Sequence, residues 1–184
     1  MRGQSGPGPS TAAQSTQPSY GHQCQLAQVS GSGSCAVDKN SDLYCWGGNS
    51  WGTLGLNTTT SHFSPVQIPG TWRNCGVTVG DGQLAFKSDG TLWAWGRNEN
   101  GIYGNNTQGD ASSRSSPVQV GTDTNWQNAT AIRAQSSVMS TKTDGTLWAW
   151  GANQKGILGQ NQSYQVERSS PTQIGTDTTW QPRL

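Results

Sequence analysis

The sequence is poor in charge and in apolar residues. Of its 184 residues only 11% are charged and 30% are hydrophobic, and the formal net charge is +1. A balance this close to zero provides no basic surface that could follow a phosphate backbone, which argues against nucleic acid as a partner. No run approaches the roughly 18 consecutive apolar residues that a membrane-spanning helix needs. We therefore expect neither nucleic-acid binding nor a membrane span.

Residues that support metal binding or acid–base catalysis are also scarce. The two histidines, His22 and His62, have no nucleophile or orienting acid at a suitable spacing. The four cysteines include no Cys-x-x-Cys pair, so a zinc site is not expected. Asp89 and Asp144 occupy the same turn position in two similar segments, where aspartate serves backbone geometry. We expect no enzymatic activity, no metal and no cofactor.

The N-terminal segment differs in composition from the rest of the chain. Residues 1–22 are mostly Gly, Pro, Ser, Gln and Thr, with scarcely an apolar side chain. Such a segment cannot bury enough surface to offset the entropy of ordering it, so we predict an extended, flexible arm or linker. It also lacks the hydrophobic centre of a secretory signal. Folded structure is expected over residues 23–184.

Glycine is abundant, and it recurs with fixed spacing. The sequence contains three copies of one unit, over about 25–71, 72–125 and 126–180. Each copy has a Lys/Asp/Asn/Ser-containing turn, a short aromatic strand such as TLWAWG, and the loop pattern Gly-x-Asn-x-x-Gly-x-x-Gly. The loop begins with these glycine and asparagine pairs: Gly47 and Asn49, Gly96 and Asn98, Gly151 and Asn153.

Tryptophan recurs in the same register. A lone tryptophan follows each SPVQI-like segment, and the three are 54 positions apart: Trp72, Trp126 and Trp180. Others lie in the aromatic strands: Trp46, Trp93, Trp95, Trp148 and Trp150. Because alternate residues of a strand face opposite sides, TLWAW is apolar on both faces and must be covered on both. We interpret the tryptophans as structural, filling the space between stacked sheets.

The turns and strands of each copy predict a small antiparallel sheet. Asp-Gly or Asn-Ser between short apolar runs indicates a hairpin, because the turn needs a residue at positive φ. The proline of the SPVQI-like segment suits an outer strand, where it breaks no ladder hydrogen bond. Three or four strands per unit, stacked through aromatic faces, are typical of a propeller blade or a β-solenoid.

The combined pattern resembles the regulator of chromosome condensation repeat. The resemblance is carried by the Asp-Gly hairpin, by LWAWG-x-N-x-x-G and by SSP-x-Q-x-G, and covers about residues 25–180. It implies an all-β fold, a partial β-propeller of three blades preceded by the extended arm. The best-known member of the family is a nucleotide exchange factor for a small GTPase and binds chromatin, whereas this chain shows no insertion that could act as a wedge into a GTPase.

The number of copies departs from the family pattern. Family members usually close a ring of about seven blades, and three blades cannot close one. The outward faces of the first and last blades would then expose apolar residues, which favours association. We expect the chain to form a homo-oligomer or to dock on a larger assembly. The alternative is that it is a fragment of a longer propeller.

The cysteines cluster in the first copy and at the start of the second. If the first hairpin turns around Asn40, Cys35 and Cys45 lie opposite each other and are close enough for a disulfide. Two buried thiols remain the alternative, because the second copy has a plain apolar pair at these positions. A pairing of Cys24 with Cys75 between blades is a weaker prediction. A disulfide would favour an oxidising setting.

The segments 56–63, 105–115 and 160–169 vary between copies and are the candidate binding loops. Their polar side chains, which include Asn57, Arg114, Asn161 and Tyr164, suit contacts with protein or glycan. Our first hypothesis is a non-enzymatic assembly, decoration or adhesion component, extracellular or on a particle such as a phage virion. The alternative is an intracellular regulatory module that binds a GTPase or chromatin.

Overall fold

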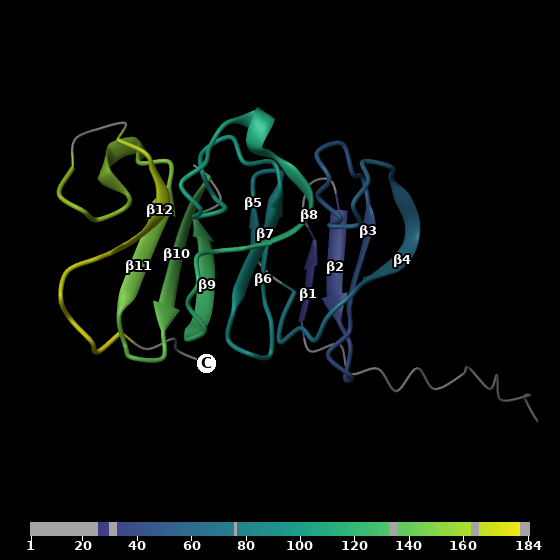
Figure 1. Cartoon of the computed structure of the whole chain (residues 1–184), viewed down its shortest axis with the longest axis horizontal. Coiled ribbons are helices and arrows are strands. Elements are labelled where there is room, and N and C mark those ends of the chain that lie inside the picture. Colours follow the sequence, from purple (N-terminus) through teal and green to yellow (C-terminus); the bar gives the residue numbers. More distant parts are fainter. Residues whose placement is uncertain (1–25, 30–32, 76, 133–135, 163–165, 181–184) are drawn as a thin grey trace, which may run out of the picture.

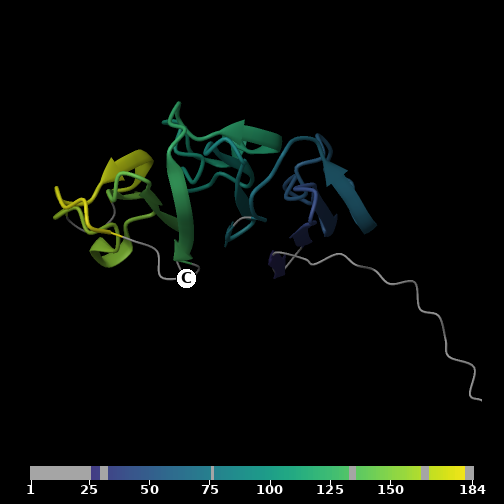
Figure 2. The same cartoon turned by 90° about the horizontal axis from the view of Figure 1, so that it is seen from below.

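The computed structural model describes residues 26–29, 33–75, 77–132, 136–162 and 166–180. In these ranges the chain is all-β, with two short 3-10 helices, η1 (Asp110–Ser112) and η2 (Gln154–Gly156). The predicted arm, residues 1–22, lies outside the described residues. Three separate sheets stand side by side in chain order (Figure 1), and the view from below shows them fanned along an arc (Figure 2).

Each sheet has four antiparallel strands that follow one another in sequence. The first contains β1 (Leu26–Val29), β2 (Gly33–Val37), β3 (Leu43–Gly47) and β4 (His62–Ile68). The second contains β5 (Val77–Val79), β6 (Gly82–Phe86), β7 (Leu92–Gly96) and β8 (Arg114–Gln119). The third contains β9 (Trp126–Ile132), β10 (Ser137–Lys142), β11 (Leu147–Gly151) and β12 (Arg168–Gln173). This meander of four strands is the architecture of a propeller blade.

The central hairpin of each sheet forms where the turn signals predict it. Gly90 and Gly145 have φ of 83° and 81°, and Ser41 takes the same role in the first sheet with φ of 68°. Asp89 supports its turn through Oδ1, which accepts the backbone N–H and the hydroxyl of Thr91 at 3.0 and 2.6 Å. The aspartates of these turns therefore act on backbone geometry, which is the role the sequence indicated.

The proline-containing strands lie at sheet edges. β4, β8 and β12 each pair on one side only within the described sheets, so Pro65, Pro117 and Pro171 interrupt no central ladder. Each edge strand also shifts register against its neighbour, at Cys45–Gly47, Ala94–Gly96 and Ala149–Gly151 respectively. The repeated shift shows that one local sequence pattern builds the same edge three times.

The apolar cores lie between neighbouring sheets. One cluster joins the first and second sheets through residues such as Cys45, Leu54 and Trp95. The other joins the second and third through Leu84, Trp126, Trp150 and their neighbours. A blade of this size cannot bury its apolar faces alone, so stability depends on stacking against the next. In the described part of the chain no helix is long and apolar enough to cross a membrane.

Candidate interaction surface

The three Gly-x-Asn loops emerge at one edge of the sheets, the upper edge in Figure 1. In each loop the side-chain Oδ1 of a buried asparagine accepts the backbone N–H of the residue five positions later, at 2.9–3.2 Å. The pairs are Asn49 with Leu54, Asn98 with Tyr103, and Asn153 with Leu158. The preceding glycines, Gly47, Gly96 and Gly151, have φ of 109°, 90° and 99°. These residues shape the loops and leave the tips to carry other side chains.

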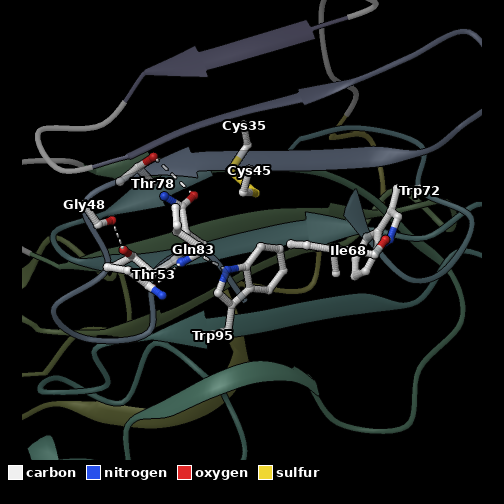
Figure 3. The surroundings of a disulfide bond; sticks show 11 residues. Cys35, Cys45, Gly48, Thr53, Ile68, Trp72, Thr78, Gln83 and Trp95 are labelled. Carbon is white, nitrogen blue, oxygen red and sulfur yellow. Dashed lines mark hydrogen bonds between the residues drawn. A yellow bond between two sulfur atoms is a disulfide. The ribbon is translucent and has the colours of Figure 1, made fainter. Parts of the chain in front are cut away.

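Two of the strand tryptophans connect neighbouring sheets. The indole N–H of Trp95 donates to the carbonyl of Thr53 at 2.9 Å, and that of Trp150 donates to the carbonyl of Ile102 at 2.8 Å. In each case the acceptor lies in the Gly-x-Asn loop of the preceding sheet. Figure 3 shows Trp95 reaching toward Thr53 beside the first sheet. Trp46, the equivalent residue in the first sheet, is half-buried.

The lone tryptophans have different surroundings. Trp72 and Trp126 are each 1% exposed and pack against Trp95 and Trp150, with ring centroids 5.8 and 5.7 Å apart. Trp180, at the equivalent position after the third sheet, is 44% exposed. The prediction that these tryptophans fill the space between sheets therefore describes Trp72 and Trp126, and Trp180 has no sheet beyond it in the described residues.

The remaining strand tryptophans, Trp93 and Trp148, are half-buried. Their indole N–H groups donate to the hydroxyls of Thr91 and Thr146, at 2.7 and 2.8 Å. A lysine ammonium lies 3.8 Å from the centroid of each ring, Lys87 over Trp93 and Lys142 over Trp148. The same cation–π contact therefore occurs once in the second sheet and once in the third. We interpret both contacts as stabilising the hairpins rather than forming a binding site.

The first hairpin contains the predicted disulfide. Cys35 and Cys45 are directly opposed partners of β2 and β3, with Cα atoms 4.2 Å apart, and their sulfurs are bonded (Figure 3). Both side chains are buried in the core shared with the second sheet. Cys75 is also buried there. Its suggested partner, Cys24, lies outside the described residues.

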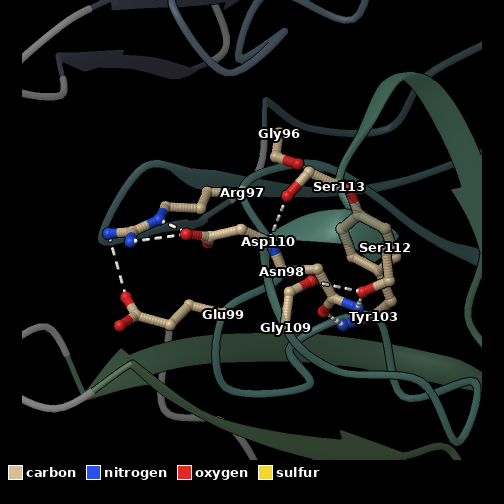
Figure 4. A network of polar contacts seen from close by, with 9 residues as sticks. All are labelled: Gly96, Arg97, Asn98, Glu99, Tyr103, Gly109, Asp110, Ser112 and Ser113. Carbon is tan, nitrogen blue, oxygen red and sulfur yellow. Dashed lines mark hydrogen bonds and ion pairs between the residues drawn. The ribbon is translucent and has the colours of Figure 1, made fainter.

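A polar network lies at the loop edge of the second sheet (Figure 4). The guanidinium of Arg97 contacts both carboxylate oxygens of Asp110, at 2.8 and 3.0 Å, and a carboxylate oxygen of Glu99 at 2.9 Å. The hydrogen bonds between Arg97 and Asp110 raise the pKa of Arg97 and lower the pKa of Asp110. A bidentate pair fixes the direction of both side chains, although it lies at the surface and adds little stability.

Tyr103 anchors this network from below. Its hydroxyl donates to the carbonyl of Gly96 at 2.5 Å and accepts the backbone N–H of Arg114 at 2.6 Å. Burial raises the pKa of Tyr103 to about 12, so it stays protonated at physiological pH. The hydroxyl therefore ties the start of β8 to the end of β7, and the loop between them is held at both ends.

Trp51 of the first sheet completes the surface. Its ring lies under the guanidinium of Arg97, 4.8 Å from the centroid to Cζ, and it is 37% exposed. Arg97 also lines a cavity of about 60 Å³, together with residues that include Asp81, Asn100 and Ser136. A drug-sized ligand needs several hundred Å³, so this cavity suits a side-chain tip or water. We call Trp51, Arg97, Glu99 and Asp110 the loop-edge cluster.

The predicted loop residues are dispersed along the same edge. Asn57, Arg114 and Asn161 are exposed, and Asn57 and Asn161 have positive φ of 57° and 49°. Arg114 donates to the carbonyl of Ser113 at 2.9 Å. The structure does not gather them with the loop-edge cluster into one pocket, and Tyr164 lies outside the described residues. Sequence reasoning missed Trp51, although an aromatic at a loop tip where the other copies have Asn100 and Lys155 was a usable signal.

A second hollow lies between the outer strands of the first two sheets. It has a volume of about 440 Å³, and its lining includes Asn57, Ile68, Trp72, Trp93 and Pro117. Trp72 and Ile68 are buried within it, whereas Asn57 lies at its rim. Over the described residues no group of three His, Cys, Asp or Glu side chains could hold a metal ion.

Comparison with known families agrees with this architecture. Residues 40–84, 89–134 and 144–180 match the family described as Regulator of chromosome condensation (RCC1) repeat. The matches cover more than half of the chain, and the chain belongs to this family. The fold is accordingly a partial β-propeller of three RCC1-type blades. A search of curated protein sequences found no significant match.

Solved structures with the same fold include human WBSCR16, with a TM-score of 0.70 and 21% identity over 86% of this chain and 39% of that one. Prp20p from Saccharomyces cerevisiae, described with its binding properties to Gsp1p and histones, gives 0.67 and 18% over 83% and 38%. Yeast RCC1 (Prp20) bound to Kap60 gives 0.69 and 18% over 85% and 36%. The chain spans less than two fifths of each, and at these identities the likeness concerns the fold.

Proposed function

We propose that the chain is a non-enzymatic, protein-binding module of the RCC1 type, and that its loop edge contacts an intracellular regulatory protein. The partner is a small GTPase or a chromatin protein. The observation that carries the proposal is the loop-edge cluster: an exposed tryptophan stacked on an arginine that two carboxylates hold in place, on blades of an RCC1 repeat. Repeat proteins commonly bind through such loop edges.

The chemistry of the cluster suits a protein surface. Tryptophan and arginine are enriched among residues whose truncation weakens protein interfaces most. Arg97 and Trp51 are positioned before a partner arrives, which lowers the entropy lost on binding. The adjoining cavity of about 60 Å³ is too small for a drug-sized ligand. The net charge of +1 does not favour a polyanion.

The relatives supply the partner class. Yeast Prp20p is described as binding Gsp1p and histones, and it was also solved with Kap60. This chain is 18% identical to it and spans 38% of its length in one of those structures. The partner class is therefore transferred as a hypothesis about a surface, and exchange activity on a GTPase is not part of the proposal.

Binding to two defined probes tests this proposal. The full chain is immobilised and titrated with purified Gsp1p and, separately, with core histones. We expect one of them to bind, and Trp51→Ala and Arg97→Ala each to weaken that binding about tenfold, which is the size of effect expected for interface residues. Lys39→Ala is the matched control, because Lys39 is an exposed cation at the opposite, turn edge. Absence of binding to both probes, or equal loss in the control, would contradict the proposal.

A second candidate function is favoured by the disulfide. The Cys35–Cys45 bond is more typical of secreted or particle-borne proteins than of reducing compartments. It would suit an assembly, decoration or adhesion component, extracellular or on a phage virion, with a protein or glycan partner. Mass spectrometry of alkylated protein from cells of the source organism separates the two candidates. A bridged chain outside the cell supports the second, and reduced thiols inside support the first.

A further inference from the structure

Both junctions between neighbouring sheets contain the same backbone hydrogen bond. The N–H of Asn57 donates to the carbonyl of Ser115 at 2.6 Å, and the N–H of Asn106 donates to the carbonyl of Ser169 at 2.7 Å. The donors follow the Gly-x-Asn loop of one sheet, and the acceptors lie at the start of the outer strand of the next. Each junction also contains the hydrogen bond from an indole of the next sheet to a loop carbonyl. A junction therefore has two sides, which we call half-faces: the loop of one sheet, and the indole and outer strand of the next.

Glycine permits the close approach at each junction. A Cβ atom at Gly52 would overlap the backbone of Ser115, and a Cβ atom at Gly101 would overlap that of Ser169. At Gly156, the third member of the set, the same test finds open space with nothing within 4 Å. All three glycines have φ between 72° and 74°. The third loop therefore has the conformation of the other two, but no strand of the described residues lies against its glycine.

Among the described residues, the surroundings of Gly156 leave this half-face uncovered. Ile157 is half-buried, whereas its equivalent Ile102 is 2% exposed. Gly159 and Asn161 are exposed, and Trp180 is 44% exposed. Within the described ranges neither the Asn161 N–H nor the Ile157 carbonyl makes the contact seen at the other junctions. We call Gly156, Ile157, Gly159, Asn161 and Trp180 the third-sheet face.

The first sheet carries the complementary half-face. Trp46 stands at the position of Trp95 and Trp150, the two indole donors, and is half-buried. Phe63 stands at the position of Ser115 and Ser169 and is 99% exposed. A single exposed apolar side chain is ordinary on a protein surface, so Phe63 matters here through its position, which is that of the two serines that accept the junction hydrogen bonds. We call Trp46 and Phe63 the first-sheet face.

We propose that the third-sheet face binds the first-sheet face of a second copy of this chain. By the geometry of the two internal junctions, the N–H of Asn161 donates to the carbonyl of Phe63, and the indole of Trp46 donates to the carbonyl of Ile157. Trp180 packs beside Trp46 as Trp72 packs beside Trp95. One chain carries both half-faces, so a second copy satisfies every requirement without an unrelated partner.

The contact is head to tail, which determines the assemblies that follow from it. If the rotation between sheets closes after two chains, the product is a dimer in which both pairs of faces are used. If it does not close, the chains form a larger assembly by the same contact. The surface is separate from the loop-edge cluster, so this inference does not depend on the proposed regulatory partner.

Light scattering on the full chain, residues 1–184, tests the proposal. Its mass is measured over a wide range of concentration, together with Gly156→Ala, Trp180→Ala and Gly121→Ala. Gly156→Ala places a methyl group where a docked strand would approach, while the isolated chain has room for it. Gly121→Ala is the matched control, because Gly121 also has positive φ, 62°, and open space but lies on the second sheet.

We expect the wild type and Gly121→Ala to reach the mass of two or more chains. Gly156→Ala and Trp180→Ala should weaken association about tenfold or more. A wild-type monomer at all concentrations would overturn the proposal, as would association that Gly156→Ala leaves unchanged. Trp46→Phe gives a second check, since it keeps the ring but removes the indole donor, and the proposal requires weaker association without loss of the fold by circular dichroism.

Discussion

The second and third copies of the repeat place the same residue in different environments. Trp126 is 1% exposed and contacts Trp150, whereas Trp180, 54 positions later, is 44% exposed. The two tryptophans make equivalent backbone hydrogen bonds: the N–H of Trp126 donates to the carbonyl of Gly90, and that of Trp180 donates to the carbonyl of Gly145. Their different burial arises from the neighbouring sheet alone. A repeat sequence therefore specifies one half of a junction, and the neighbour determines what that half contributes to stability.

The largest expected effect comes from removing the buried member of that pair. Trp126→Ala should lower the free energy of unfolding by about 3–5 kcal/mol, because it leaves a cavity in the core of the second junction. Trp180→Ala, measured where the chain is monomeric, should change it by less than about 1 kcal/mol. Urea denaturation followed by circular dichroism gives both values. Equal losses would mean that the two environments do not differ in solution.

The disulfide distinguishes the first sheet from the second. Blade two has Leu84 opposite Ala94 where blade one has Cys35 opposite Cys45. Replacing both cysteines by the apolar pair of the second sheet, Cys35→Leu with Cys45→Ala, should lower the free energy of unfolding by about 2–3 kcal/mol. This is the loop-closure contribution expected for a disulfide between residues ten positions apart. Urea denaturation of the variant under non-reducing conditions measures the loss. A variant as stable as the wild type would show that packing alone suffices, as it does in blade two.

The loop glycines provide an intermediate effect. Gly101→Ala should lower the free energy of unfolding by about 1–3 kcal/mol more than Gly156→Ala, because only at Gly101 does the added methyl group meet a neighbouring strand. Both changes carry the same cost of about 1–2 kcal/mol for positive φ, which cancels in the difference. Thermal or urea denaturation of the two variants, measured where the chain is monomeric, checks this. No difference would argue that the junction adapts to the extra atom.

The smallest effect is expected at the turns. Hydrogen bonds from the hydroxyl and N–H of Thr146 lower the pKa of Asp144. A carboxylate with a lowered pKa contributes stability that is present above its ordinary titration range and is lost as pH falls through the folded-state value, below about pH 4. Because Asp144 is exposed, Asp144→Ala should cost about 0.5 kcal/mol or less at neutral pH. A carboxyl NMR titration that gives an ordinary pKa would contradict this assignment.

The sequence was sufficient to predict the fold of each sheet. Hairpin turns, edge prolines and aromatic strands that are apolar on both faces are local features of the sequence. Because each occurs three times, a chance match is improbable. The opposed pair Cys35 and Cys45 followed from counting outward from one turn. The family resemblance then identified the three sheets as propeller blades. The family match and the solved structures confirm this prediction of the fold.

The loop edge was much less predictable. Arg97, Trp51 and Asp110 occupy positions that do not repeat, and their meeting depends on how the 105–115 segment folds back and on the placement of the neighbouring sheet. Neither is encoded in a local pattern. Sequence variation pointed to this edge through Arg114 and Asn57, but it could not show which side chains contact one another, and their role in binding stays a prediction. The domain limits, the arm and the cellular setting stay predictions.

The repeated junction between sheets is best examined by hydrogen exchange of the tryptophan indole N–H groups, followed by NMR. One junction is built twice within the chain, through the indoles of Trp95 and Trp150. We expect slow exchange at these two indoles and fast exchange at Trp180, with exchange at Trp46 slowing only at concentrations where the chain associates. Fast exchange at Trp95 or Trp150 in the folded protein would contradict the repeated junction.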